Sequence, residues 1–403
     1  MNGHHCVLNS IEVADVFRQF GPSYIETFGT RMPPSHRRAI EDIAACRTKA
    51  MGGHLYQCED CGERFHVYHG CRNRACPACH THQTALWLEA RTTELLPCPY
   101  YHVCVTVPAE LRAMFRANQK DAYGALMKAA AQTVMALCQD LRYMGAAPAI
   151  LAVLHTWTVR MNHHPHVHLL VSGGGIADDG VSWREAKHPY LIPVRAASSI
   201  LRAKFRELMD KQQPGLCAKQ PGAAWRKKWV VWCKHSGEGE TAVLDYLARY
   251  VYRIAITNAR IVAMDERTVT FRYKERKKSR WRTRTVSGHE FMRRFLQHVL
   301  PKGFHKVRYY GLWNPKKRAR LHNACIALQL APERDCRSTP MQPNLDAAQS
   351  PTPEASTNAT GANDVTPICP HCGSVHTRHI GPVEPQRPTN NKRASPRAIP
   401  IPA

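Results

Sequence analysis

The sequence lacks any apolar segment long enough to cross a membrane. A bilayer-spanning helix needs about 18 or more consecutive apolar residues, and no such run occurs among the 403 residues. The first residues, Met1 to Cys6, also lack the basic and then apolar layout of a secretory signal peptide. We therefore expect a cytoplasmic protein of bacterial type with no membrane partner.

Acidic residues are also scarce. The chain has 31 Asp and Glu residues against 56 Lys and Arg residues, which gives a net charge of +25 at neutral pH. An excess of this size indicates a polyanionic partner and says nothing about the fold. The alternative is a soluble basic protein without a nucleic-acid role.

The chain shows no internal repeat, but its composition changes along its length. We expect a helical segment at 1–45, a cysteine-rich module at 46–95 and a domain of mixed strands and helices at 96–330. Such a mixture predicts an α+β fold. The tail at 331–403 should be disordered, because residues 340–367 are rich in Pro, Ser, Thr, Asn and Ala and carry few large apolar side chains.

Six of the sixteen cysteines fall between positions 46 and 79. Cys58 and Cys61, then Cys76 and Cys79, form two C-x-x-C pairs fourteen residues apart, which is typical of tetrahedral zinc rather than of disulfides. Four thiolates leave no open position on zinc, so we expect a role in folding or DNA contact rather than catalysis.

Cys71, Cys46 and His54 remain outside that zinc site. They could form a second zinc site with His66, His69 or His80, or rearrange the first, or be buried free thiols. Within the tail, Cys369 and Cys372 with His376 and His379 have the ligand types of a small knuckle at 369–379, although their spacing is compact.

The segment His164-Pro-His-Val-His168 predicts a strand with one functional face. Side chains alternate along a strand, so His166 and His168 point to the same side and can hold one cation. Val167, Leu169 and Val171 alternate with them and can bury the opposite side. The alternative is a pair of histidines on a solvated strand face.

Tyr246 and Tyr250 lie four residues apart in a segment predicted to be helical, so they are neighbours on one helix face. A phenol attacks phosphorus only if a cation polarises the phosphate and basic neighbours, here Arg249 and Arg253, favour the phenolate. The alternative is aromatic packing. Tyr252 faces roughly the other side, and we interpret it as structural.

A basic and aromatic run follows at 272–284. Cations interleaved with Trp281 suit a surface that follows the backbone of single-stranded DNA and stacks its bases. A solvated hairpin is the alternative. The candidate DNA contacts in this run are Arg276, Lys277, Lys278, Arg280, Trp281 and Arg282.

These motifs together resemble the two-tyrosine HUH transposases of rolling-circle insertion sequences. The resemblance rests on Leu154-His-Thr-Trp157, on His164 to His168 with Gly173 to Gly175, on Tyr246 to Ile261, and on the amino-terminal cysteine motifs. It covers about residues 10 to 325 and implies an HUH endonuclease-type antiparallel sheet with flanking helices. A zinc-binding module would precede this domain and a disordered tail would follow it.

The resemblance also implies roles for individual residues. His166 and His168 would hold Mg or Mn, Tyr246 would attack to leave a 5′-phosphotyrosine, and Tyr250 would act in the second strand transfer. A third metal ligand stays open among His155, Asp245, Asn258 and, with less weight, His164.

The partners implied are single-stranded DNA at transposon ends and target DNA, with host replication proteins as a further class and nucleoid association as the location. A plasmid or phage replication initiator or relaxase is the alternative within the same chemistry. A non-catalytic zinc protein that binds DNA is the alternative from another class.

Overall fold

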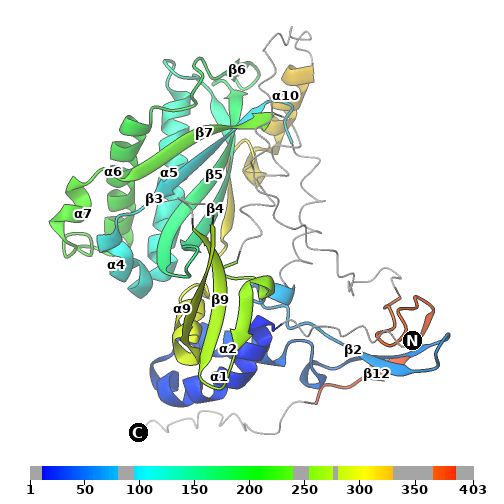
Figure 1. The fold of residues 1–403 in the computed structure, drawn as a ribbon. Helices are drawn as coiled ribbons and strands as arrows, with labels where there is room; N and C mark the ends of the chain where they lie inside the picture. Colours follow the sequence, from blue (N-terminus) through cyan, green and yellow to red (C-terminus); the bar gives the residue numbers. More distant parts are fainter. Residues whose placement is uncertain (1–10, 80–94, 239–253, 276–279, 330–365, 387–403) are drawn as a thin grey trace, which may run out of the picture.

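A computed structural model describes residues 11–79, 95–238, 254–275, 280–329 and 366–386. Figure 1 shows an antiparallel sheet with helices on its faces, and beside it a smaller unit with its own helices and strands. The expected mixed α+β class with antiparallel sheets is confirmed. Within these residues, every helix is too short or too polar to span a bilayer.

The central sheet has the strand order β11-β4-β5-β3-β7, with β6 added beside β5. All of its neighbouring strands are antiparallel. The strands are β3 (Pro99–Thr106), β4 (Ala147–Trp157), β5 (His163–Ile176), β6 (Trp183–Glu185), β7 (Val230–Glu238) and β11 (Val307–Gly311).

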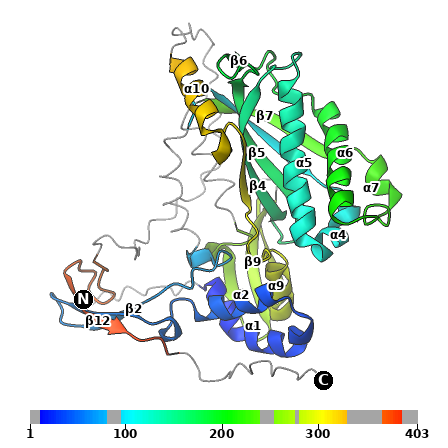
Figure 2. The ribbon, with the colours of Figure 1, turned by 180° about the vertical axis from the view of Figure 1, so that it is seen from behind.

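One face of this sheet is covered by α5 (Gln119–Gln139) and α6 (Val194–Gln212), as Figures 1 and 2 show. Val167, Leu169 and Val171 of β5 are fully buried in the core beneath these helices, as their alternation predicts. The smaller elements at the same side are η3 (Ala109–Leu111), α4 (Arg112–Ala117) and α7 (Gly222–Arg226).

The opposite face is covered at one end by α10 (Arg318–Gln329), which follows η6 (Pro315–Lys317). Leu151 and Leu170 of the sheet belong there to a second apolar cluster with Trp313 and Ala324. His155 of β4 and His166 and His168 of β5 lie on this same face, because they alternate with the residues beneath α5.

The smaller unit brings together segments that are far apart in the sequence. Its helices are α1 (Val13–Phe28), α2 (Pro34–Ala45) and α9 (Gly288–Leu296), and its strands are β8 (Ile261–Met264), β9 (Thr268–Glu275) and β10 (Arg280–Ser287). The short turns η1 (Gly29–Arg31), η2 (Lys49–Met51) and η5 (Asn258–Arg260) connect these elements.

Phe17 and Phe295 meet in the core of the smaller unit, with ring centroids 4.9 Å apart. The amino-terminal helices α1 and α2 therefore share a core with β8 to α9. The segment from β8 to α9 belongs to the range 96–330, which the sequence predicted to be one domain. Composition along the chain could not show this, because the contact is set by tertiary packing.

The smaller unit binds the turn between β4 and β5. Thr158 donates its backbone N–H to the carbonyl of Asn162, which closes this turn. Three side chains donate hydrogen bonds to carbonyls of this turn. Arg260 donates to the Val159 carbonyl at 2.6 Å and Arg294 to the Arg160 carbonyl at 2.9 Å. Gln297 donates to the Met161 carbonyl at 2.6 Å. The strand end that leads to His166 is thus anchored by side chains of the other unit.

The cysteine-rich module is a hairpin of β1 (Gly53–Cys58) and β2 (Arg64–Tyr68), and it projects sideways from α1 and α2 (Figure 1). A third strand, β12 (Thr377–Val383), pairs antiparallel with β1. The expectation of a disordered tail is therefore wrong for residues 366–386. The free edge of β1 offers backbone partners to this strand, which local composition does not reveal.

Replacing Phe295 with Ala should lower the free energy of unfolding by about 3–5 kcal/mol, because it empties a buried aromatic site. Phe28→Ala is the matched control, since Phe28 is 43% exposed and should cause a much smaller loss. Urea denaturation followed by fluorescence measures both. Equal losses in the two variants would contradict this account of the core.

Candidate functional site

Three histidines converge on the face of the central sheet opposite α5. His166 and His168 come from β5, and His155 of β4 lies directly opposite His166 in the strand register. One ring nitrogen of each lies within 4.8 Å of those of the other two, and all three side chains are buried. His155 was one of the open candidates for a third ligand, and tertiary structure places it beside the predicted pair.

Hydrogen bonds orient two of these rings. The Nδ1 atom of His166 lies 2.7 Å from the carbonyl oxygen of His164. A carbonyl only accepts, so Nδ1 donates and Nε2 keeps its lone pair for a metal. The Nδ1 atom of His168 lies 2.8 Å from Nε2 of His102, which likewise leaves Nε2 of His168 to face the cluster.

His102 was missed by the sequence analysis. Burial lowers the pKa of His102 to about 4, so this imidazole is neutral and can share one hydrogen with His168. Its place on β3, in an alternating strand segment, was the available signal. No spacing rule connects position 102 with position 168, however, because only the pairing of β3 with β5 brings them together.

Tryptophans flank the cluster. The ring of Trp157 stacks on His155 at 4.6 Å between centroids, and Trp232 of β7 meets His102 edge-on at 5.1 Å. Trp232 is 46% exposed, so it also presents a stacking surface beside the histidines. Aromatic rings around a metal site restrict water and hold the ligands in place.

The other candidates for a third ligand lie elsewhere or outside the described residues. Asn258 caps α1, because its amide contacts the Glu12 carboxylate at 3.0 Å and the Val13 N–H at 3.1 Å. The Nδ1 atom of His164 lies 2.9 Å from Arg112. The predicted nucleophiles and their neighbours fall outside the described residues: Asp245, Tyr246, Arg249, Tyr250 and Arg253.

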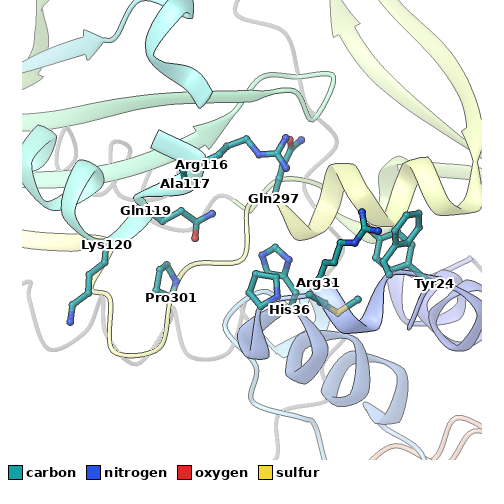
Figure 3. A pocket seen from close by; sticks show the side chains of 12 residues that line it. Tyr24, Arg31, His36, Arg116, Ala117, Gln119, Lys120, Gln297 and Pro301 are labelled. Carbon is teal, nitrogen blue, oxygen red and sulfur yellow. The ribbon is translucent and has the colours of Figure 1, made fainter. Parts of the chain in front are cut away.

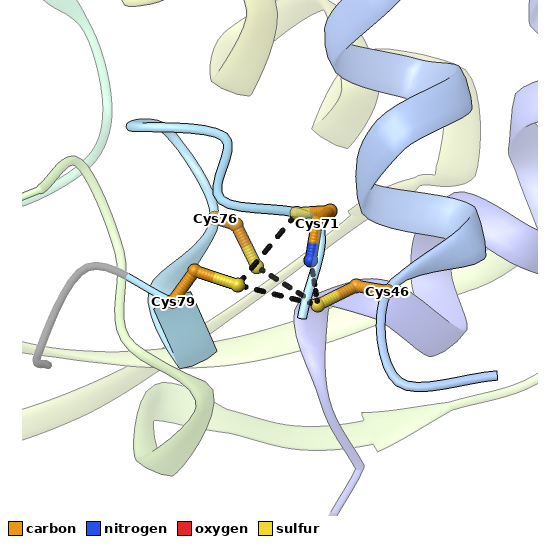
Figure 4. A group of neighbouring side chains, drawn as sticks. All are labelled: Cys46, Cys71, Cys76 and Cys79. Atoms are coloured by element: carbon orange, nitrogen blue, oxygen red, sulfur yellow. Dashed lines mark hydrogen bonds between the residues drawn. The ribbon is translucent and has the colours of Figure 1, made fainter. Parts of the chain in front are cut away.

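A first group of four cysteines closes the base of the hairpin (Figure 4). Cys46 lies 3.5 Å from Cys79 and 3.7 Å from Cys76, and Cys71 lies 3.8 Å from Cys79, all measured between sulfurs. Zn–S bonds of about 2.3 Å in a tetrahedron require sulfurs about 3.8 Å apart. The Cys71 N–H also points to the Cys46 sulfur at 3.4 Å, which favours a thiolate. The group fits zinc.

The predicted grouping of Cys58, Cys61, Cys76 and Cys79 is therefore wrong. Strand β1 carries Cys58 five residue steps from Gly53, about 17 Å at the usual rise of a strand. The C-x-x-C pair at the hairpin tip lies with Cys369 and Cys372 instead. Spacing along the chain could not distinguish the base of the hairpin from its tip.

Among the described residues, no histidine joins either group of cysteines, and the candidate His80 lies outside them. The Nδ1 atom of His54 lies 3.0 Å from Nε2 of His379, across the pairing of β1 with β12. His376 lies 3.3 Å from the Asp60 carboxylate. Two predictions are therefore wrong. His54 is not a ligand of a second zinc site, and Cys369 and Cys372 group with Cys58 and Cys61 instead of with His376 and His379.

The basic segment lies partly on β10. Trp281 is 50% exposed, and the Arg272 guanidinium lies over its ring at 5.1 Å from the centroid. Arg282 pairs with Glu275 at 2.9 Å, and Arg280 is exposed at the start of the strand. Arg276, Lys277 and Lys278 lie outside the described residues.

A basic cleft of about 470 Å³ lies between the amino-terminal helices and the region of α4 and α5 (Figure 3). Burial, with a further effect of Arg116, lowers the pKa of His36 to about 4, so the arginines and the lysine carry the charge. The charged side chains of its lining are those of Arg31, Arg116 and Lys120, and apolar residues such as Phe28 and Met32 complete it.

Comparison with known proteins agrees with this arrangement. Residues 149–320 match the family described as "Putative transposase", and residues 16–107 match the "Transposase zinc-binding domain". The chain is 40% identical over 331 residues to the protein "Putative transposase y4qJ" of Sinorhizobium fredii, covering 78% of this chain and 83% of the relative. The chain belongs to the two-tyrosine transposases of rolling-circle insertion sequences.

A second relative of this transposase family is the "Transposase for insertion sequence element IS801" of Pseudomonas savastanoi pv. phaseolicola. It is 26% identical over 297 residues, which cover 68% of each chain. No solved structure matches the chain. The resemblance read from the motifs is confirmed, and the zinc-binding module coincides with the first group of cysteines.

Cys71→Ser should remove about one zinc ion per chain, because three thiolates bind zinc far more weakly than four. The unit of α1, α2 and α9 should then unfold at a lower temperature, since Cys46 and Cys76 belong to its core. Elemental analysis and calorimetry measure the two effects. Cys325→Ser on α10 is the control and should keep the zinc content of the wild type. Unchanged zinc in Cys71→Ser would refute the ligand set.

Proposed function

We propose that this transposase nicks and rejoins single-stranded DNA at the ends of its element through a 5′-phosphotyrosine. The observation that carries the proposal is the convergence of His155, His166 and His168 on one sheet face, in a chain of this family. Three imidazoles on paired strands suit a divalent cation that still has positions for phosphate oxygens.

A bound Mg or Mn ion would withdraw charge from the scissile phosphate. Imidazole suits softer ions better than Mg, so substrate oxygens would complete the shell if Mg is the ion used. The hydrogen bonds of His102 and of the His164 carbonyl keep the Nε2 atoms of His168 and His166 turned to that position. His102 and His164 therefore orient the ligands and take no part in the phosphoryl transfer itself.

Tyr246 would supply the attacking oxygen. Its phenolate forms a bond to phosphorus while the bond to the 3′ oxygen breaks, and the departing 3′ oxygen takes up a proton. The phosphotyrosine conserves the energy of the broken phosphodiester, so rejoining needs no nucleotide cofactor. Tyr250 would repeat the step in the second strand transfer.

The DNA partners are the single-stranded element ends and the target, with host replication proteins as a further class. Trp281 and the exposed arginines of β10 provide stacking and charge for a single strand. Arg249 and Arg253 would favour the phenolate of the nearby tyrosines. The similarity to named transposases favours transposition over replication initiation.

A labelled single-stranded oligonucleotide that contains an element end should form an adduct resistant to denaturation, and only with Mg or Mn. His155→Ala should lower the yield at least about 10-fold, because the loss of a metal ligand costs no less than the loss of a residue that only orients a ligand. His188→Ala is the control, since its ring contacts the Arg142 carbonyl and Tyr190 instead of the cluster. Equal yields from the two variants would exclude His155 as a ligand.

Mass spectrometry of the adduct should identify Tyr246 or Tyr250 as the modified residue. The double variant Tyr246→Phe and Tyr250→Phe should bind DNA with wild-type affinity and form no adduct. An undiminished adduct in that variant would refute the nucleophile assignment. Binding without any adduct in the wild-type protein would instead favour a non-catalytic DNA-binding protein.

Trp281→Ala should weaken the binding of single-stranded DNA by about 1–3 kcal/mol, the usual value for one stacked base. The salt dependence is the slope of the logarithm of the binding constant against the logarithm of the salt concentration. In the double variant Arg280→Ala and Arg282→Ala this slope should become smaller in magnitude by about 0.7 for each phosphate that these arginines neutralise. Fluorescence anisotropy at several salt concentrations measures both effects. Tyr190→Ala, which removes an exposed aromatic ring elsewhere, should leave both unchanged.

A further inference from the structure

We propose that a second zinc ion, held by Cys58, Cys61, Cys369 and Cys372, joins the tip of the hairpin to the segment at 366–386. The four sulfurs lie within 4.8 Å of one another. Cys58 is 3.6 Å from Cys372 and Cys61 is 3.7 Å from Cys369, close to the edge of about 3.8 Å in a tetrahedral zinc site. The zinc-binding family match ends at residue 107, so half of this ligand set lies outside it.

The two cysteine pairs form turns with the same hydrogen bonds. In the first, the Gly62 N–H donates to the Cys58 carbonyl at 3.0 Å, and the Cys58 N–H donates to the Glu63 carbonyl at 2.9 Å. These bonds bring Cys58 and Cys61 to one side of a tight turn, where both sulfurs can reach one ion.

The second turn repeats this pattern. The Gly373 N–H donates to the Cys369 carbonyl at 2.9 Å, and the Cys369 N–H donates to the Ser374 carbonyl at 2.8 Å. Gly62 and Gly373 both have φ of +76°, a conformation that glycine adopts without strain. Two turns of the form C-x-x-C-G, with equal backbone geometry, thus face each other across a space that fits one ion.

The distances distinguish zinc from the alternatives. A disulfide requires sulfurs about 2.05 Å apart, whereas all four cysteines are free and the sulfurs of Cys58 and Cys372 lie 3.6 Å apart. Ordinary burial does not explain the group either, because Cys61 and Cys372 are exposed. The local apolar cluster is small, with only Cys58, Phe65 and Cys369 buried in it. A module with so little core is typically stabilised by a metal.

Other contacts between the two turns are polar and exposed. The Glu59 N–H donates to the His376 carbonyl at 2.9 Å, and the Ser374 hydroxyl donates to the Asp60 carboxylate. Exposed contacts of this kind contribute little stability against water. They set the orientation of the turns, and the ion would provide the binding energy.

The ion would close a loop of 308 residues between Cys61 and Cys369. It would hold β12 against β1, and so protect an edge strand that would otherwise be open to pairing with other chains. The second site is thus a clasp between the carboxyl-terminal segment and the hairpin. It is separate from the first site, which is built into the core of the smaller unit.

Elemental analysis of the purified full-length protein should find about two zinc ions per chain, one for each group of four cysteines. The double variant Cys369→Ser and Cys372→Ser should contain about one. His379→Ala is the matched control, and it should keep both ions because His379 contacts His54 and not the sulfurs. Two ions in the cysteine variant would overturn the proposal, as would disulfides found at these cysteines by mass spectrometry.

A second measurement does not depend on counting ions. A protease site inserted within residues 340–360 allows the chain to be cut, and the fragment carrying β12 should then remain bound to the rest of the protein. In the double variant Cys58→Ser and Cys61→Ser the fragment should be released during gel filtration. Retention of the fragment in that variant would show that strand pairing alone holds it, against the proposal.

Discussion

The pairing of β4 with β5 is the constraint on which the histidine centre depends. It places His155 directly opposite His166, while Val167 and Leu169 are turned into the core under α5. Because side chains alternate along a strand, a slip of one residue would send the histidines into that core and Val167 and Leu169 to the opposite face. The cost of exposing the apolar side therefore also holds the imidazoles in position, so packing on one face of the sheet determines chemistry on the other.

The same strands connect this centre to the smaller unit. The turn between β4 and β5 lies just beyond His155 and just before His166, and Arg294 and Gln297 at the end of α9 bind its carbonyls. The smaller unit also carries β10, with the exposed Trp281. A surface suited to a DNA strand and a centre suited to its phosphate are thus joined through one short turn. Hydrogen bonds from side chains of the smaller unit to the carbonyls of this turn set their relative position.

The cysteine-rich module follows a different physical principle. A hairpin of two short strands buries too little apolar surface to be stable alone, and metal sites at its two ends compensate. At its base, Cys46 and Cys76 are part of the core that contains α1 and α9, so the ion would join the hairpin to the protein. At its tip, the proposed clasp brings in a strand from beyond residue 366. Each C-x-x-C pair supplies two ligands, and tertiary contact selects the other two.

Much of this organisation follows from sequence alone. Strand alternation placed His166 and His168 on one face, cysteine spacing identified zinc-binding turns, and the charge pointed to a polyanion, because each of these signals depends on neighbours along one element. Only the tertiary structure showed that His155 joins His166 and His168 and that His102 contacts His168. It also showed which cysteines form each group of four, and that β12 pairs with β1. These depend on strand register and on contacts between segments up to about three hundred residues apart, and no local spacing encodes which distant partner a strand edge or a thiol will meet.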